Sequence, residues 1–141
     1  MDIFKATYEA STSLLPRFDL VPGIAGAKEK LQQEVVELII AADGLLQLED
    51  TIREDIRYNS QMEVAEEIAD VIITAINLGK AAGLAEHNLR IALLKKNEKN
   101  NLKTPLTHEV VIWPNGAMTI ERIGRYPDLP KWKHDEQPQH A

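Results

Sequence analysis

The chain contains no cysteine, and this absence removes several kinds of chemistry at once. Disulfide bonds, thiolate nucleophiles and zinc sites built from cysteine are all excluded. The four histidines are scattered and form no closely spaced pair of metal ligands. Positive charge is also scarce, because 16 Lys and Arg residues stand against 22 Asp and Glu residues, for a net charge of −6. This balance argues against a surface that binds the backbone of a nucleic-acid polymer.

Long hydrophobic runs are missing as well. The longest mainly apolar stretch, residues 71–84, is interrupted by Thr74, Asn77 and Lys80, so it is too short and too polar to span a membrane. The N-terminal sequence "MDIFKATYEAS" has an acid at position 2 and makes a poor signal peptide. We therefore expect no membrane partner and a cytoplasmic location. A chain of 141 residues, 44% of them hydrophobic, is long enough for one domain with a sizeable core.

The spacing of apolar residues predicts helices over most of the chain. A short helix is expected within residues 2–14, and an amphipathic helix over 24–50, where Asp43-Gly44 is a candidate kink. The next helix is expected over 61–82. A capping box formed by Ser60 and Glu63 would begin it, and Gly83 would end it. A further helix is expected over 85–100.

The sequence changes character after Pro105. Two runs rich in β-forming residues flank Pro114-Asn115-Gly116, a pattern that predicts a hairpin with a three-residue loop. The expected organisation is an all-α domain over residues 1–104, a β-hairpin extension packed on the same domain over 105–133, and an extended, disordered tail over 134–141.

The helix expected over 61–82 carries its polar residues on one narrow strip. Helical residues advance by about 100° each, and the strip covers an arc of roughly 100°. Its members are Glu63, Glu66, Glu67, Asp70, Thr74 and Asn77. The strip lacks any Lys or Arg, although a solvated helix face usually mixes charges of both signs. A strip this narrow predicts a helix that is buried over most of its circumference.

The preceding helix repeats the arrangement, because Glu34 and Glu37 are also three residues apart. If the two helices pack antiparallel, this pair can face Glu67 and Asp70. Four converging carboxylates would repel one another and resist ionisation, and a hard divalent cation relieves that repulsion. Ligation by oxygen alone favours Mg²⁺ or Mn²⁺ over zinc. The residues leave a second interpretation open, in which the acids are solvated and the chain is a non-catalytic helical oligomerisation module.

Two motifs carry a family resemblance. "EVVE", which begins at Glu34, followed by "EIAD", which begins at Glu67, resembles the ExxE…ExxD signature of the all-α nucleotide pyrophosphohydrolases. That superfamily includes MazG-like enzymes, dimeric dUTPases and phosphoribosyl-ATP pyrophosphohydrolases. "KKNEKNNLK" resembles its K-x-x-x-N-x-x-[RK] run, with Lys96, Asn100 and Lys103 at the matching spacing. The resemblance covers about residues 24–103, and Lys103 stands where Arg is commoner.

The resemblance implies a four-helix-bundle-like MazG core and Mg²⁺-dependent hydrolysis of (deoxy)nucleoside triphosphates to the monophosphate and pyrophosphate, in nucleotide-pool housecleaning. It also implies a homodimer or homotetramer, which the wide apolar arcs of the helices favour independently. A phosphoribosyl-ATP pyrophosphohydrolase is the alternative within the superfamily. A di-iron bundle would use Glu-x-x-His pairs, and neither acidic pair contains a histidine.

Each candidate site residue has an expected role. Glu34, Glu37, Glu67 and Asp70 would hold the metal, and Glu37 is the candidate general base. The substrate would be bound by Lys96, Lys99, Asn100, Lys103 and Asn77.

Overall fold

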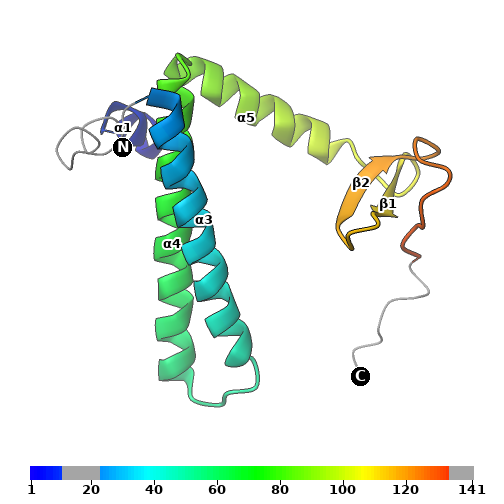
Figure 1. The fold of residues 1–141 in the computed structure, drawn as a ribbon, viewed down its shortest axis with the longest axis horizontal. Helices are drawn as coiled ribbons and strands as arrows, with labels where there is room; N and C mark the ends of the chain where they lie inside the picture. The colour runs from blue at the N-terminus through cyan, green and yellow to red at the C-terminus, as the bar shows by residue number, and fades with distance from the viewer. Residues whose placement is uncertain (11–22, 134–141) are drawn as a thin grey trace. The chain divides into compact units, whose positions relative to one another are not determined.

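The computed structural model describes residues 1–10 and 23–133. In chain order, its elements are α1 (Ile3–Ala10), α3 (Gly23–Gln47), α4 (Glu54–Ala81), α5 (Glu86–Asn101), β1 (His108–Ile112) and β2 (Met118–Arg122) (Figure 1). The prediction of a mostly helical chain followed by a β-hairpin is confirmed. The expected end of the first helix at residues 11–14 and the expected disordered tail at 134–141 lie outside the described residues.

The chain divides into two compact units, Met1–Ala92 and Leu93–Ala141. The first, here called the helical unit, holds α1, α3, α4 and the beginning of α5. The second, here called the hairpin unit, holds the rest of α5 and the two strands. The acidic residues of interest belong to the helical unit.

Helices α3 and α4 run side by side in opposite directions and form the body of the helical unit (Figure 1). The sequence favours this pairing, because Leu31, Leu38 and Leu45 recur every seven residues along one side of α3, and all three are half-buried. The connection between the helices is only six residues long, residues 48–53, which suits antiparallel neighbours. The acids of the two helices are therefore brought to comparable heights along the pair.

Helix α4 begins seven residues earlier than expected, at Glu54. The predicted capping box of Ser60 and Glu63 is wrong, because both residues lie inside the helix. Arg53 precedes the helix with an extended backbone and makes no side-chain capping bond. The acidic residues of the first turn, Glu54 and Asp55, suit the positive end of the helix dipole instead.

The other helix boundaries follow the sequence more closely. Helix α3 continues through Asp43-Gly44 without interruption, so the candidate kink does not break it. Gly83 does end α4, with a left-handed φ of 88°. Its N–H donates to the carbonyl of Lys80 at 3.0 Å, and the N–H of Leu84 donates to that of Gly79 at 3.0 Å. This pattern satisfies carbonyl groups at the end of α4, as a glycine in this position usually does.

The C-terminal end of α4 is held by α1 and by the beginning of α5. The Tyr8 hydroxyl donates to the carbonyl of Leu84 at 2.8 Å, and Lys80 Nζ donates to the carbonyl of Tyr8 at 2.9 Å. Arg90 of α5 forms ion pairs with Asp2 at 2.5 Å and with Glu86 at 2.9 Å. These contacts fix the end of the α3–α4 pair that is farthest from the 48–53 connection.

In the hairpin unit, β1 and β2 pair antiparallel with Val110 opposite Ile120. Gly116 has a φ of 86° and lies in the connecting loop, as the sequence predicts. Trp132 N–H donates to the carbonyl of Val110 at 3.0 Å on the other edge of β1. The strand pair thereby buries Val111 completely.

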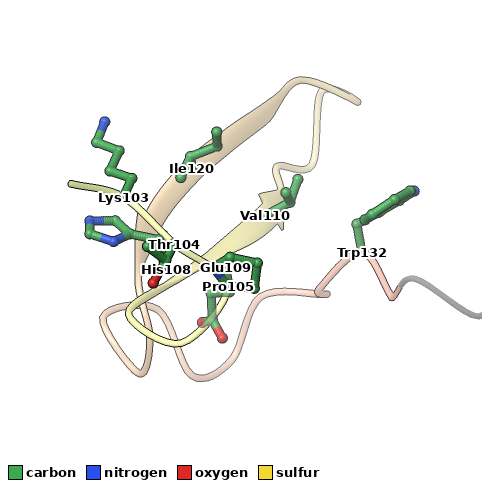
Figure 2. A pocket seen from close by; sticks show the side chains of 8 residues that line it. All are labelled: Lys103, Thr104, Pro105, His108, Glu109, Val110, Ile120 and Trp132. Carbon is green, nitrogen blue, oxygen red and sulfur yellow. The ribbon is translucent and has the colours of Figure 1, made fainter. Parts of the chain in front are cut away.

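A cavity of about 510 Å³ lies within the hairpin unit beside the strands. Figure 2 shows Lys103 and His108 at one end of its lining and Trp132 at the other, with Val110 and Ile120 between them. Among the residues that the structure describes, no helix is long and apolar enough to cross a membrane.

Candidate metal centre

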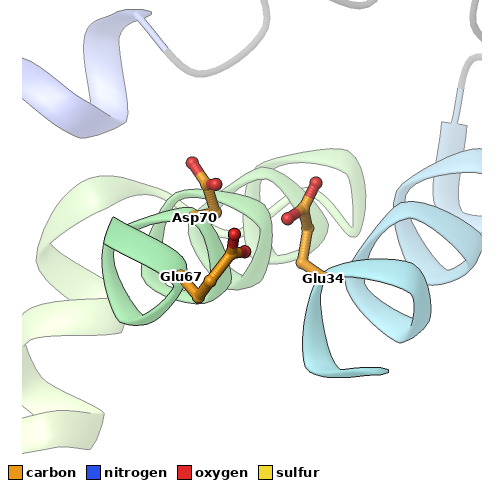
Figure 3. A group of neighbouring side chains, drawn as sticks. All are labelled: Glu34, Glu67 and Asp70. Atoms are coloured by element: carbon orange, nitrogen blue, oxygen red, sulfur yellow. The ribbon is translucent and has the colours of Figure 1, made fainter. Parts of the chain in front are cut away.

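Three acidic side chains from two helices meet on one side of the α3–α4 pair. Glu34 comes from α3, and Glu67 and Asp70 come from α4. One carboxylate oxygen of each lies within 4.8 Å of the other two. Figure 3 shows the three side chains pointing to the same side of the helices and toward one another. The convergence of acids from the two helices, which the sequence predicts, is therefore observed for these three residues.

Local helix geometry explains the convergence. Glu67 and Asp70 are three residues apart, so they project side by side from α4. Glu34 is three residues after Leu31 and four before Leu38, and it therefore lies next to the side of α3 that packs on α4. This position buries it, and only 6% of Glu34 remains exposed. Burying a carboxylate costs free energy unless another group compensates its charge.

Neighbouring groups compensate the negative charge of these buried carboxylates only in part. Lys30 Nζ lies 2.8 Å from Glu34 Oε1, one turn earlier on α3. Glu34 Oε2 and Glu67 Oε2 are buried, and neither has a hydrogen-bond partner among the described residues. Sequence reasoning missed Lys30, although its position four residues before Glu34 is the signal of a helical ion pair.

Glu37 lies next to this group without being one of the three closest acids. Its hydrogen bond with Glu34 and the charge of Glu34 raise the pKa of Glu37 above the ordinary value, and burial and Glu67 raise it further. The pKa of Glu67 is also raised, first by burial and then by the charges of Asp70 and Glu34. The hydrogen bond with Glu34 raises the pKa of Lys30, which keeps that residue charged. The four acids therefore share one strongly negative environment.

The arrangement fits a hard divalent cation. The donors are carboxylate oxygens, which Mg²⁺, Mn²⁺ and Ca²⁺ prefer. Opposite ligands of an octahedral Mg²⁺ are about 4.1 Å apart, twice the metal–oxygen distance. Neighbouring ligands are about 2.9 Å apart, and at most one pair among three ligands can be opposite, so oxygens that lie within 4.8 Å of one another must move closer by side-chain rotation to share one ion. The buried oxygens of Glu34 and Glu67 that lack partners are the observation that points to a cation.

Asn77 lies two turns beyond Asp70 on α4. It is 6% exposed, and its Oδ1 has no hydrogen-bond partner among residues 1–10 and 23–133. Thr74, between the two, is different, because its hydroxyl donates to backbone carbonyls of its own helix at 2.9 and 3.1 Å. Of these two polar residues in the strip, only Asn77 keeps a buried acceptor available for a ligand.

The basic residues expected to bind substrate lie in the hairpin unit. Lys96, Lys99 and Asn100 are exposed on the last turns of α5, and Lys103 follows the helix and is half-buried. Lys96, Lys99 and Asn100 are three and four residues apart, which places them along one side of the helix, whereas Lys103 lies beyond its end at Asn101. Their role in binding phosphate stays a prediction.

The chain matches no protein-family model, no curated protein and no solved structure. Function must therefore be argued from the chemistry of the site, because a helical fold supports many unrelated activities.

Proposed function

We propose that the protein is a Mg²⁺-dependent nucleoside triphosphate pyrophosphohydrolase that releases pyrophosphate and a nucleoside monophosphate. The observation that carries the proposal is the meeting of Glu34, Glu67 and Asp70, with two buried carboxylate oxygens that lack partners. The motif resemblance supports the same activity and supplies the substrate class. Mn²⁺ is the expected substitute metal, because it accepts the same oxygen ligands.

In this proposal, Glu34, Glu37, Glu67 and Asp70 hold the metal. A divalent cation bound there would neutralise phosphate oxygens and lower the pKa of a bound water. Phosphoryl chemistry needs this kind of positioning and charge neutralisation more than it needs a protein nucleophile. The absence of cysteine from the chain is therefore compatible with the reaction.

Glu37 acts as the general base. It is adjacent to the three closest acids, and Glu34 raises its pKa toward the pH at which a base works best. Glu37 would accept the proton of the attacking water as pyrophosphate leaves. Glu34 is a weaker candidate for this role, because Lys30 occupies one of its oxygens at 2.8 Å.

Substrate recognition is assigned to the remaining polar residues. Lys96, Lys99 and Lys103 would pair with the triphosphate, and Asn100 would donate to phosphate or sugar. Asn77 Oδ1 is a buried acceptor, so it would receive a hydrogen bond from a hydroxyl of the sugar or an amine of the base. A nucleotide in the cell pool, rather than a polymer, is the substrate that suits a chain of net charge −6.

The test is a Mg²⁺-dependent screen for pyrophosphate release over ribo- and deoxyribonucleoside triphosphates and phosphoribosyl-ATP, with the products identified. We expect pyrophosphate and a monophosphate from at least one nucleoside triphosphate. Glu67→Gln should abolish this activity, whereas Glu66→Gln, one residue away and exposed, should retain it. Release of orthophosphate alone, or full activity of Glu67→Gln, would contradict the assignment. If phosphoribosyl-ATP alone is hydrolysed, the protein is a phosphoribosyl-ATP pyrophosphohydrolase instead.

A second candidate function is a non-catalytic helical oligomerisation module. The specific observation in its favour is the large number of exposed apolar side chains on α3 and α4, including Ile39, Ile40 and Ile72. The two candidates differ in metal binding. A site that binds divalent metal, and loses it when Glu67 and Asp70 are both changed to Ala, supports the enzyme.

A further inference from the structure

The cavity of the hairpin unit has the size of a site for a small molecule. Its volume of about 510 Å³ falls within the range of about 300–1,000 Å³ that is usual for ligand pockets. All of its lining residues lie between Lys103 and Trp132, so the cavity belongs to this unit alone. None of the described acids of α3 and α4 lines it. Lys103 is the one lining residue to which the proposed function gives a role.

The two faces of the strand pair differ in how well they are packed. Successive strand residues point to opposite faces. On one face, Val111 is fully buried, and the Trp113 ring packs edge-on against Tyr126 with the ring centroids 4.9 Å apart. On the other face, His108 and Val110 border the cavity (Figure 2). The hairpin therefore has one packed face and one face that is open to a ligand.

The middle of the cavity is apolar. Ile120 lies opposite Val110 in the register, so both side chains stand on the open face. Because the Val110 carbonyl accepts from Trp132 N–H on the other edge of β1, Val110 and Ile120 do not exchange backbone hydrogen bonds, and side chains of such a pair lie close together. Val110 is half-buried, and Ile120 is 54% exposed. An apolar strip of this kind suits the body of an organic ligand better than an inorganic ion.

One end of the cavity carries positive charge. Lys103 is half-buried, and its ammonium forms no ion pair or hydrogen bond with any described residue. His108 Nδ1 lies 2.7 Å from the Thr107 hydroxyl. When that hydroxyl donates, the imidazole carries its proton on Nε2, which can then donate to a ligand. Arg122 opposes His108 in the register and adds positive charge on the same face. These groups favour an anion at this end.

The acid in the lining leaves this positive charge in place. Glu109 Oε1 lies 3.6 Å from Lys131 Nζ and accepts the N–H of Gly124 at 3.4 Å. Glu109 also follows His108 directly on β1, so its side chain leaves the strand toward the opposite face. Its charge is therefore compensated within the hairpin unit, and the ammonium of Lys103 is available to a ligand.

The other end of the cavity is formed by Trp132. Figure 2 shows this side chain on the far side of Val110 from Lys103 and His108. An indole ring offers a wide flat surface, and contacts between aromatic rings are favourable beyond the area that they bury. The cavity thus offers a cationic end, an apolar middle and an aromatic end, in that order.

We propose that this cavity binds a small organic anion that contains a planar aromatic ring. Lys103 and His108 hold the anionic group, and the ring lies on Val110 and Ile120 against Trp132. A carboxylate and a phosphate share this chemistry. The proposal does not depend on the metal centre or on the proposed activity, because every contact comes from the hairpin unit.

The test uses the two tryptophans of the chain, which give two indole N–H signals in a ¹⁵N–¹H correlation spectrum. Trp113→Phe assigns them. In the full chain with chelator, indole-3-acetate should shift the Trp132 signal saturably and leave that of Trp113, which donates to Thr119 at 2.7 Å. Indole-3-acetamide has the same ring without the charge and should bind about tenfold more weakly, because it lacks the charge-assisted hydrogen bonds.

Adenosine monophosphate, titrated in the same way, compares a phosphate with the carboxylate. A saturable shift of the Trp132 signal by either anion supports the proposal, and the tighter ligand identifies the preferred anionic group. If neither anion shifts this signal saturably, or if indole-3-acetate and its amide bind equally well, the proposal is wrong.

Substitutions separate the cavity from the metal centre. Lys103→Gln and His108→Gln should each weaken binding of the anion by about tenfold, through loss of one charge-assisted hydrogen bond. Lys95→Gln removes an exposed lysine of α5 outside the cavity and should bind like the wild type. Glu67→Gln, which lacks a proposed metal ligand, should also bind normally. Unchanged binding in both cavity variants, or lost binding in Glu67→Gln, would overturn the proposal, whereas a failed pyrophosphate screen would not affect it.

Discussion

The two sides of the α3–α4 pair both expose groups that the helices alone do not satisfy, but they need different partners. On the acidic side, buried oxygens of Glu34 and Glu67 lack hydrogen-bond partners among the described residues. On the apolar side, isoleucines such as Ile39 and Ile72 are more than half exposed. A small cation can bind the carboxylate oxygens, whereas exposed isoleucines can be covered only by another surface. One pair of helices thus carries both buried carboxylate oxygens without described partners and isoleucines that are more than half exposed.

The largest expected effect comes from removing one metal ligand on the acidic side. Asp70→Asn keeps the size of the side chain but removes its charge, and the metal should then bind poorly. We expect the Mg²⁺-dependent kcat/KM to fall by at least about 100-fold, because changes even to residues that only hydrogen-bond to a metal ligand cost about 10–100-fold. Steady-state kinetics on the substrate found in the screen gives the measurement. Unchanged activity with a native circular dichroism spectrum would exclude Asp70 as a ligand.

Metal binding should also stabilise the fold, through the acidic side only. A ligand that binds only the folded state adds about 2.7 kcal/mol at 100 times its Kd. We therefore expect MgCl₂ to raise the Tm of the wild-type protein in a thermal scan. The increase should disappear in Glu67→Gln and persist in Ile72→Ala, which separates the two sides. An increase of the same size in Glu67→Gln would place the ion elsewhere.

The pH dependence of the metal-free protein reports on the same carboxylates. Folding raises the pKa values of Glu37 and Glu67 above the ordinary 4.5, so between the ordinary and raised values the folded state binds more protons than the unfolded state. The contribution of these groups to stability is therefore present at low pH and is lost as the pH rises through the raised pKa. In chelator, Glu37→Gln should become more stable relative to wild type as the pH increases from about 4.5 toward 7. A constant difference between the two Tm curves would contradict the pKa shift of Glu37.

The acidic side was more predictable from the sequence than the apolar side. The spacing of Glu67 and Asp70 fixes their common direction on any helix, and a short connection makes antiparallel packing with Glu34 the simple outcome. By contrast, Leu38 and Ile39 are equally apolar in the sequence. Only the packed structure shows that Leu38 is half-buried and Ile39 is 54% exposed.

Other differences between the predicted and the observed structure have local causes. The polar run before residue 61 resembles a helix start, but α4 continues back through it. There, Arg57 is half-buried and donates to the carbonyl of Thr51 at 3.4 Å. The spacing of Asn77 places it on the same strip as Asp70, but only the packed structure shows that Asn77 is buried. Tertiary packing decides both cases.

Alanine substitutions at two glycines compare a helix position that has no neighbouring atoms with one that is closely packed. Gly44→Ala in α3 meets no atom within 4 Å, so it should stabilise the protein by about 0.5–1 kcal/mol through helix propensity. Gly79→Ala gains the same propensity but must displace Leu89 from 2.9 Å. We expect a smaller gain or a loss for Gly79→Ala by urea denaturation. Equal stabilisation by the two substitutions would show that Leu89 does not pack on Gly79 in solution.

The smallest expected effect concerns Lys30, the only cation that the structure shows within 4.0 Å of the described acids of this cluster. Its ammonium lies 2.8 Å from Glu34 and competes with a metal ion for that carboxylate. Because Lys30 is partly exposed, the pair is worth about 0.2–1 kcal/mol, so Lys30→Gln should tighten Mg²⁺ binding by roughly 1.5–5-fold in calorimetric titration. Lys28→Gln, an exposed lysine two residues earlier, controls for the loss of one positive charge. Weaker binding in Lys30→Gln alone would mean that Lys30 orients Glu34 toward the metal instead of competing with it.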